Sequence, residues 1–300
     1  MTKQVVVFMG GWSAERDVSL VSGAACAKAL QQAGYSVTAV DVQRDISGLL
    51  TRLFPAPAVV FNALHGRWGE DGCIQGLLDI LKIPYTHSGL TASAVAMDKP
   101  LSKRLFKDAG IKVAEDKIAT RGEVLAGGIM GVPYVVKPLN EGSSVGVHIV
   151  QHENTLPFAE ESWPYGDRVM VEKYIAGREL TVAVMGDRPL AVTEIMTDHN
   201  FYDYEAKYAQ GESKHTVPAD IPQDIYDETL QLAALAHQTL GCRGVSRSDF
   251  RFDGKDIFIL ELNTQPGMTP TSLVPEQAAS VGISFEELVT WMVDNAECDA

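Results

Sequence analysis

Residues 246–275 read SRSDFRFDGKDIFILELNTQPGMTPTSLVP. Two runs of apolar residues flank the turn-forming pair Asp253-Gly254, so the stretch predicts an antiparallel β-hairpin. Glu261 and Asn263 are two positions apart and face the same side of the second strand, while Asp249 lies on the first strand. A lone strand carboxylate usually faces solvent, but Glu261 follows the apolar run DIFIL, where an unpaired carboxylate would be costly. Because oxygen ligands that converge across a hairpin suit Mg²⁺, we predict a magnesium site here.

Two further features flank the predicted metal ligands. Arg247 is two positions before Asp249 and shares its face of the strand. After the second strand comes a turn-rich exit, and then a proline-containing segment, residues 269–273. The backbone amides of this segment and the Ser272 hydroxyl could bind a carboxylate, as helix N-termini do. The segment taken alone is interpreted more simply as a loop.

The N-terminal third alternates between strand and helix patterns. QVVVFMGG, residues 4–11, is a continuous apolar run that ends in glycines, as in a strand buried on both faces of a parallel sheet. A helical pattern follows and ends near Gly34. Strand patterns recur at YSVTAVDV, AVVFNALHG and IPYTHSG, and residues 92–110 have a helical pattern. We predict an open α/β sheet.

The remainder of the chain is typical of short strands joined by turns. Strand patterns occur at KVAEDKIA, PYVVKPLN, VGVHIV and RVMVEKYI, and a further hairpin is predicted around Gly186-Asp187. GEVLAGGI, IYDETLQLAALAHQTLG and SFEELVTWMVDNAE predict helices. The predicted organisation is an α/β domain over residues 1–95, followed by α+β domains over residues 96–180 and 181–300.

The composition excludes several classes of protein. The chain has 300 residues, of which 46% are hydrophobic and 21% charged, as in ordinary globular proteins. Its net charge of −14 argues against a nucleic-acid partner. No apolar stretch approaches the roughly 18 residues of a membrane span, and the first strand does not resemble a signal peptide. The four cysteines form no close pair, which favours free thiols. We expect a cytoplasmic protein.

A possible phosphate-binding loop follows a strand in VVKPLNEGSSVGV, residues 135–147. Glycines allow close approach of the backbone to a ligand, successive amides can hold phosphate oxygens, and Lys137 can add a positive charge. A hairpin turn that uses Gly and Ser only as turn formers explains the stretch equally well. The stretch is neither a Walker A loop nor a GxGxxG motif.

The segment VMVEKYIAGRELTV, residues 169–182, ends an apolar strand with Glu172, Lys173 and Ile175. A strand end that continues into a linker can offer an adenine ring an acceptor, a backbone donor and apolar contacts. An edge strand with a solvated Glu–Lys pair is the simpler interpretation of this segment alone.

Two polar segments follow strands of the predicted N-terminal sheet. GGWSAERDVS places Glu15 directly after the first strand, and LHGRWGEDG places His65 after a later one. Open α/β sheets bind ligands at the carboxyl ends of their strands. Singly, each would be interpreted as a surface glutamate or a core histidine, but together they mark one sheet edge.

FYDYEAKY, residues 201–208, alternates aromatic and charged residues and on that pattern predicts a half-buried strand. Its flanks, TDHN and AQGESKHTVPADIP, are typical of loops. The residues alone leave the strand and the loop interpretations open.

Taken in order, GGWSAERDVS, LHGRWGEDG, MDKPLSK, VVKPLNEGSSVGV, VEKYIAGRELTV, FYDYEAKY and LELNTQPGMTPTSLVP span almost the whole chain. This series closely resembles the D-alanine–D-alanine ligases of the ATP-grasp superfamily. The resemblance implies an N-terminal open parallel α/β domain followed by a two-domain ATP-grasp fold that binds ATP between its domains. It also implies that ATP phosphorylates one D-alanine, that the amine of a second attacks the acylphosphate, and that the dipeptide serves peptidoglycan synthesis.

The matching motifs imply the following site residues. The nucleotide would contact Lys99, Lys137, Ser144, Glu172, Lys173, Ile175 and Glu179. Two Mg²⁺ (or Mn²⁺) would be held by Asp249, Glu261 and Asn263. The two D-alanines would contact Glu15, His65, Arg247, Gly267, Ser272 and Leu273. Catalytic roles are implied for Glu15, Ser143, Arg247, Lys207 and Tyr208. Residues 201–208 would form a loop that covers the site, with Lys207 directed towards it and Tyr208 towards the Ser143 loop. The resemblance further implies a homodimer.

Three alternatives remain open from the sequence. The same scaffold could make D-alanyl-D-lactate, although a tyrosine at Tyr208 is usual in the dipeptide-forming enzymes. The chain could be another ATP-grasp carboxylate–amine ligase, against which Glu15 and the Ser272 segment argue. It could also be a non-catalytic ATP-binding regulator, against which the intact Asp249, Glu261 and Asn263 argue.

Overall fold

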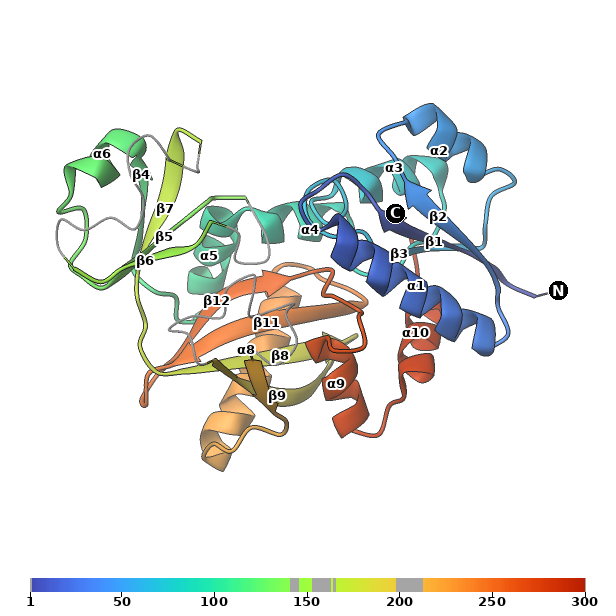
Figure 1. The fold of residues 1–300 in the computed structure, drawn as a ribbon. Coiled ribbons are helices and arrows are strands. Elements are labelled where there is room, and N and C mark those ends of the chain that lie inside the picture. Colours follow the sequence, from blue (N-terminus) through green and yellow to red (C-terminus); the bar gives the residue numbers. More distant parts are fainter. Residues whose placement is uncertain (1, 141–145, 153–162, 164–165, 198–212, 300) are drawn as a thin grey trace.

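The computed structural model describes residues 2–140, 146–152, 163, 166–197 and 213–299. It has three parts, each built on its own sheet: a parallel sheet at the N-terminus and two antiparallel sheets after it (Figure 1). This is the predicted fold class. None of the helices in the described part of the chain is long and apolar enough to cross a membrane. The four cysteines are free, as expected.

The N-terminal sheet has the order β2-β1-β3, with all neighbours parallel. Its strands are β1 (Gln4–Gly10), β2 (Ser36–Val42) and β3 (Val59–Asn62), and its helices are α1 (Arg16–Gln32), α2 (Ile46–Arg52) and α3 (Cys73–Leu81). Successive residues of β1 point to opposite faces, so Val5 and Val7 enter one apolar cluster while Val6 and Phe8 enter another. Burial on both faces explains the continuous apolar run of the sequence.

The IPYTHSG segment was predicted as a strand, and the structure corrects this. Only Tyr85 makes β-bridges, parallel to Val60 and antiparallel to Glu297. Pro84 has no N–H to donate, and His87 adopts a left-handed backbone with φ of 69°, which ends the extended conformation. The segment is therefore a short connection that reaches the last residues of the chain.

The helical pattern over residues 92–110 is divided into α4 (Leu90–Met97) and α5 (Lys99–Asp108). Asp98 has an extended backbone, and its carboxylate accepts the Leu101 N–H at 2.9 Å as the N-cap of α5. Pro100 lies in the first turn of α5, where its missing N–H costs nothing. The division places Lys99 at the start of a new helix.

The central sheet has the order β4-β7-β5-β6 and is antiparallel throughout. Its strands are β4 (Asp116–Thr120), β5 (Tyr134–Lys137), β6 (His148–Val150) and β7 (Arg168–Lys173). The helix α6 (Arg121–Ala126) begins with a capping box between Thr120 and Glu123. Because β7 is an interior strand, the interpretation of residues 169–173 as an edge strand is wrong.

The C-terminal sheet has the order β10-β9-β8-β11-β12. Its strands are β8 (Arg178–Met185), β9 (Arg188–Thr197), β10 (Ser213–Thr216), β11 (Val245–Phe252) and β12 (Ile257–Asn263). Both predicted hairpins, β8–β9 and β11–β12, are present. The helix α8 (Gln223–Thr239) packs with α5 against one apolar cluster of this sheet, and α9 (Leu273–Ser280) follows β12. The 201–208 segment, between β9 and β10, lies outside the described residues.

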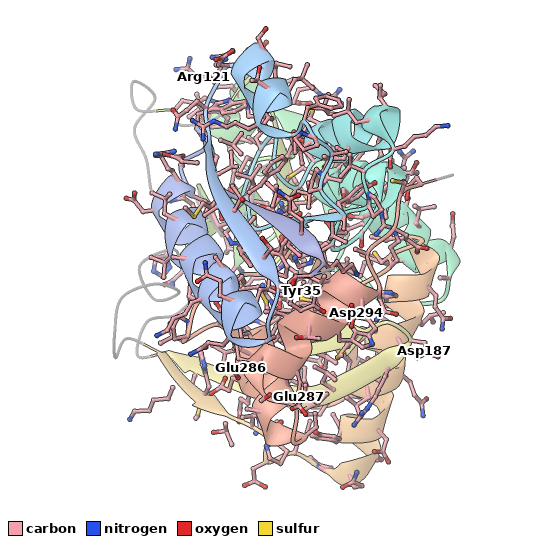
Figure 2. The ribbon with its side chains drawn as sticks, turned by 90° about the vertical axis from the view of Figure 1, so that its right-hand side faces the viewer. Tyr35, Arg121, Asp187, Glu286, Glu287 and Asp294 are labelled. Carbon is pink, nitrogen blue, oxygen red and sulfur yellow. The ribbon has the colours of Figure 1, made fainter. Side chains whose placement is uncertain are left out.

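The last helix, α10 (Phe285–Asp294), returns to the N-terminal sheet. Leu288, Val289, Met292 and Val293 share an apolar cluster with β1, β3 and α1. In Figure 2 α10 lies beside α1, and the Tyr35 hydroxyl after α1 donates to Asp294 at 3.1 Å. The first and last segments of the chain thus form one core.

Candidate active site

The face of the β11–β12 hairpin brings together the predicted metal ligands and Arg247. Asp249 lies directly opposite Glu261, and Arg247 opposite Asn263, so all four side chains leave the sheet on one side. The guanidinium of Arg247 donates to both oxygens of Asp249 at 2.9 and 2.8 Å, and the Thr181 hydroxyl donates to Asp249 at 2.6 Å. Asp249 is therefore a buried carboxylate with a fixed orientation.

The second carboxylate of the hairpin faces a lysine from another part of the chain. The ammonium group of Lys99, at the start of α5, lies 3.5 Å from Glu261. Each carboxylate thus has a cationic side chain beside it, at a position where a bound metal ion would also balance its charge.

The donor set of the hairpin fits a hard divalent cation. It consists of two carboxylates and the amide oxygen of Asn263, all oxygen ligands of the kind that Mg²⁺ prefers. In the described part of the chain no group of three or more His, Cys, Asp or Glu residues could hold a metal, so softer sites built from nitrogen or sulfur are not formed there.

A second cluster surrounds Glu172 at the end of β7. Its carboxylate is buried and contacts the ammonium groups of Lys137 on β5, at 3.0 Å, and of Lys103 on α5. Burial alone would raise the pKa of Glu172, but the charges of the two lysines outweigh it and hold the pKa below its ordinary value. Lys103 also lies 3.0 Å from Asp116 and donates to the Ala114 carbonyl at 3.0 Å. The interpretation of Glu172 as solvated is wrong.

Lys137 responds to the same charges in the opposite direction. Burial alone would lower its pKa, but the carboxylates of Glu172 and Glu261 outweigh burial and raise the pKa above its ordinary value. Lys137 therefore stays charged beside the hairpin that bears Glu261. It lies just before the possible phosphate loop, and β5 and β6 pair as a hairpin on either side of that loop.

Beyond Glu172 the chain crosses from the central to the C-terminal sheet. Lys173 is exposed, because it follows the buried Glu172 on an alternating strand, and its backbone N–H donates to the Glu115 carbonyl at 2.8 Å. Ile175 is half-buried, and Glu179 lies at the start of β8, 3.5 Å from Arg251.

The edge of the N-terminal sheet contains a pair of buried carboxylates, Glu15 and Glu70. Burial and the charge of Glu15 raise the pKa of Glu70 well above its ordinary value. Gly66 adopts φ of 70° between them: its N–H donates to Glu70, and a Cβ there would lie 2.5 Å from a Glu15 oxygen. Only glycine fits this position. Two carboxylates in a buried space suit a cationic ligand.

His65 is buried beside this pair, with Nε2 3.1 Å from the Ser22 hydroxyl. Burial lowers the pKa of His65 to about 4, so the imidazole is neutral near neutral pH. The charge of Arg247 acts on the pKa of both His65 and Glu70. The hairpin face and the sheet edge therefore share one electrostatic environment.

Gln265 connects the hairpin to the sheet edge. Its side chain accepts from the Asn62 amide at 2.8 Å and donates to the Leu64 carbonyl, while its backbone N–H donates to Asn263 at 2.8 Å. This joins the exit of β12 to the carboxyl end of β3. In this way the segment that bears His65, predicted to contact D-alanine, is joined to Asn263, predicted to bind a metal ion.

The segment after Gln265 leads to the N-terminus of α9. Ser272 is the N-cap residue, but its hydroxyl bonds to Thr269 at 2.8 Å instead of capping the helix. A Cβ at Gly267 would lie 3.0 Å from this hydroxyl, so Gly267 and Ser272 are neighbours. The helix starts at Leu273, and its first amides have no side-chain cap. This arrangement supports the predicted carboxylate site.

Most of the predicted site residues are thus gathered around one region, whereas Ser143, Ser144, Lys207 and Tyr208 lie outside the described residues. Sequence reasoning missed Lys103, Glu70 and Gln265. Glu70 and Gln265 lie inside motifs that were already singled out, and Lys103 ends the segment MDKPLSK. Their proximity to the site follows from pairings across the chain that no local pattern contains.

A parallel α/β sheet, a lysine-bearing antiparallel sheet and a carboxylate-bearing hairpin are the parts of an enzyme of the ATP-grasp class. The family described as D-ala D-ala ligase C-terminus matches residues 105–294, and the one described as D-ala D-ala ligase N-terminus matches residues 50–88. The chain belongs to the D-alanine–D-alanine ligase family.

Relatives and solved structures agree with this assignment over the whole chain. The D-alanine–D-alanine ligase of Rhodospirillum rubrum is 61% identical, with 100% of each chain covered, and that of Parvibaculum lavamentivorans is 56% identical, with 99% and 98% covered. The ligase of Bacillus anthracis complexed with ATP superposes with a TM-score of 0.83 at 29% identity, covering 98% and 97%. The VanG D-Ala:D-Ser ligase of Enterococcus faecalis gives 0.81 at 26%, covering 98% and 99%.

Proposed function

We propose that the protein joins two molecules of D-alanine to form D-alanyl-D-alanine, with conversion of ATP to ADP and phosphate. The observation that carries the proposal is the proximity of three groups: the Arg247–Asp249–Glu261 face, the buried Glu15–Glu70 pair, and the lysines around Glu172. The hairpin face offers Arg247 for a carboxylate, and the Glu15–Glu70 pair offers negative charge for an ammonium group. The lysines offer positive charge for phosphates. An amino-acid ligase requires all three. The close relatives named above support the same activity.

In the proposed first step, a carboxylate oxygen of the first D-alanine attacks the γ-phosphorus of ATP. The bond from that phosphorus to the bridging oxygen breaks, and ADP leaves with the electron pair. Glu15 and Glu70 bind the ammonium group of the amino acid, while Lys99 and Lys137 neutralise phosphate oxygens. Phosphoryl transfer depends mainly on such positioning and neutralisation. Two Mg²⁺ (or Mn²⁺), held by Asp249, Glu261 and Asn263, would add to that neutralisation when bound.

In the second step, the amine of the second D-alanine, after loss of a proton, attacks the acyl carbon. The bond from carbon to the phosphate oxygen then breaks, phosphate leaves, and the nitrogen loses its remaining extra proton. Arg247 stabilises the oxyanion that forms at the acyl group, because a preorganised donor is most effective where charge develops. The amides at the start of α9, with Ser272, bind the carboxylate of the second amino acid.

Several residues complete the proposed site. Glu172, Lys173 and Ile175 frame the adenine, Glu179 binds the ribose, and Gly267 and Leu273 line the acyl and acceptor positions. Ser143 and Ser144 cover the phosphates, and Lys207 and Tyr208 act from the segment between β9 and β10. The dipeptide is made in the cytoplasm and serves peptidoglycan synthesis. Three domains, residues 1–95, 96–180 and 181–300, together form the enzyme.

A direct test measures phosphate release and identifies the product by mass, near neutral pH, with ATP and Mg²⁺. D-Alanine alone is compared with D-alanine plus D-lactate and with D-alanine plus D-serine. We expect D-alanyl-D-alanine as the main product in every mixture. Preferred formation of the D-lactate ester or of a mixed dipeptide would refute D-alanine as the acceptor. An absence of ADP formation would refute the proposed ligase activity.

We further propose that the protein is a homodimer through α3 and α4. Ile80 on α3 is 80% exposed and Leu90 at the start of α4 is 40% exposed. Leu90 packs over Gly76, where a Cβ would lie 2.7 Å from its side chain, so the two helices form one apolar surface. Light scattering should give a dimer for the wild type and a monomer for Ile80→Asp. Ile46→Asp, on the exposed face of α2, is the matched control and should stay dimeric.

A further inference from the structure

Arg251, near the end of β11, contacts the segment that joins the central sheet to the C-terminal sheet. Its guanidinium donates to the Gly177 carbonyl at 3.3 Å and to the Tyr174 hydroxyl at 3.0 Å. It also lies 3.5 Å from a carboxylate oxygen of Glu179 and 5.4 Å from the centre of the Tyr174 ring. One buried side chain therefore binds three residues of a six-residue stretch, Tyr174 to Glu179.

Tyr174 is also held by its N–H, which donates to the Pro133 carbonyl at 3.2 Å, and Arg178 and Glu179 already belong to β8, so the residues between them have the fewest contacts. Ala176 and Gly177 are small and exposed, and Gly177 adopts φ of 120°. A Cβ at Gly177 would lie 2.1 Å from the Phe252 carbonyl oxygen, so the backbone of the segment passes directly over the end of β11. Glycine gives the chain this path but adds conformational freedom, which the planar fork of an arginine can remove.

The contacts of Arg251 connect the two ends of the proposed nucleotide site. On one side of the segment is the end of β7, with Glu172 proposed for the adenine. On the other side is Glu179, which pairs with Arg251 across β8 and β11 and is proposed for the ribose. A carboxylate has about four lone-pair positions, so an ion pair at 3.5 Å leaves Glu179 able to accept from a hydroxyl.

We propose that Arg251 is a positioning residue for the nucleotide sugar. It orients the carboxylate of Glu179 and fixes the distance between Glu179 and the end of β7, so that adenine and ribose are bound together. Without Arg251, Glu179 loses a cationic partner in a poorly hydrated position, and the segment over Gly177 loses its side-chain anchor. This inference rests on the proposed function, because it assumes a nucleotide at these residues.

The test is Arg251→Met, which preserves most of the side-chain length and removes the fork. Binding of ADP and of 2′-deoxy-ADP and 3′-deoxy-ADP is measured by calorimetry, which needs no turnover, together with KM and kcat for ATP. We expect roughly a tenfold loss of ADP affinity and a similar rise in KM for ATP, with kcat at saturating ATP changed by less than about twofold. The preference of the wild type for ADP over the deoxynucleotides should shrink towards one.

Three variants make the outcome decisive. Arg251→Lys retains the charge without the fork and should be intermediate; it also serves as the test protein if Arg251→Met does not fold. In a Glu179→Gln background, Arg251→Met should change ribose discrimination little further, because both act through one contact. Arg178→Met removes the neighbouring arginine that pairs with Glu194 and should leave ribose discrimination unchanged.

Equal losses of affinity for ADP and both deoxynucleotides in Arg251→Met would overturn the inference and reduce Arg251 to a structural residue. Failure of the proposed function gives a different result, since the wild type would then form no ADP with D-alanine or bind no nucleotide in the first experiment.

Discussion

Replacing Lys103 by Met is expected to weaken ATP binding even though Lys103 is not proposed to touch the nucleotide. In the structure Glu172 contacts two ammonium groups, and one of them, Lys137, is proposed above to neutralise phosphate oxygens, which would draw its charge away from Glu172. Lys103 stays, because Asp116 and the Ala114 carbonyl also bind it. In Lys103→Met, Lys137 becomes the last cation beside Glu172, so its transfer to ATP leaves a buried carboxylate without a counter-charge.

The magnitude follows from the burial of the cluster. The side chains of Lys103 and Glu172 are only 3% and 4% exposed, so their interaction is weakly screened. Removal of one partner from a buried pair costs about 3–5 kcal/mol, and Lys137 offsets part of this in the free protein but not once it binds phosphate. We expect a loss of about 3 kcal/mol in ATP binding, or roughly a 100-fold rise in KM for ATP.

The assay is steady-state ADP formation over a range of ATP concentrations at saturating D-alanine, with urea unfolding measured in parallel. Lys117→Met is the matched control, since Lys117 lies on β4 and its ammonium group donates to the Ile129 carbonyl at 3.1 Å in an exposed position. Lys103→Met/Glu172→Gln should recover much of the loss in KM relative to Lys103→Met alone, because the stranded charge is gone. A KM within about twofold of wild type in Lys103→Met, with stability lowered, would refute the reasoning.

Three other changes test separate parts of the site and fold. Glu261→Gln should abolish turnover while thermal unfolding stays near wild type, because a shared metal carboxylate is lost; wild-type activity would remove the metal assignment. Burial and the charge of Glu15 raise the pKa of Glu70 well above its ordinary value, and a bound ammonium group would lower that pKa again. Calorimetry in buffers of different ionisation enthalpy, at several pH values, should therefore detect proton release when D-alanine binds at pH values between the lowered and the raised pKa, and Glu70→Gln should show less release. His237 has its pKa lowered to about 4 by burial, so the unfolded state binds the proton first. The contribution of neutral His237 to the free energy of unfolding should be fully present above about pH 6.5 and should fall towards pH 4 by up to about 1.4 kcal/mol per pH unit. In His237→Gln the free energy of unfolding, measured with urea, should change less steeply with pH.

The elements that sequence predicted well are those set by local pattern. The apolar run of β1 and the turn at Asp253-Gly254 determine their strands through neighbours a few residues away. The register that places Asp249 directly opposite Glu261 was not predicted and comes from the structure. Alternation also places Glu172 and Lys173 on opposite faces, but it does not say which face is buried.

The features that sequence did not predict depend on distant partners. The break at Asp98 requires knowledge that its carboxylate caps α5, and the single bridge at Tyr85 depends on Glu297 at the other end of the chain. Lys103 and Glu172 are 69 positions apart, and only the folded chain, which brings Lys103 on α5 to the end of β7, makes them partners. Such pairings leave no periodic signal.

The return of α10 to the first sheet has a consequence during synthesis. The apolar face of β1 that holds Val5 and Val7 is covered jointly by α1 and by Leu288 and Met292 of α10. A ribosome makes residues 1–95 long before it makes α10, so the nascent N-terminal part carries an uncovered apolar surface for most of translation. A chaperone that binds extended apolar segments would have a binding site there until α10 has been made and packs against β1.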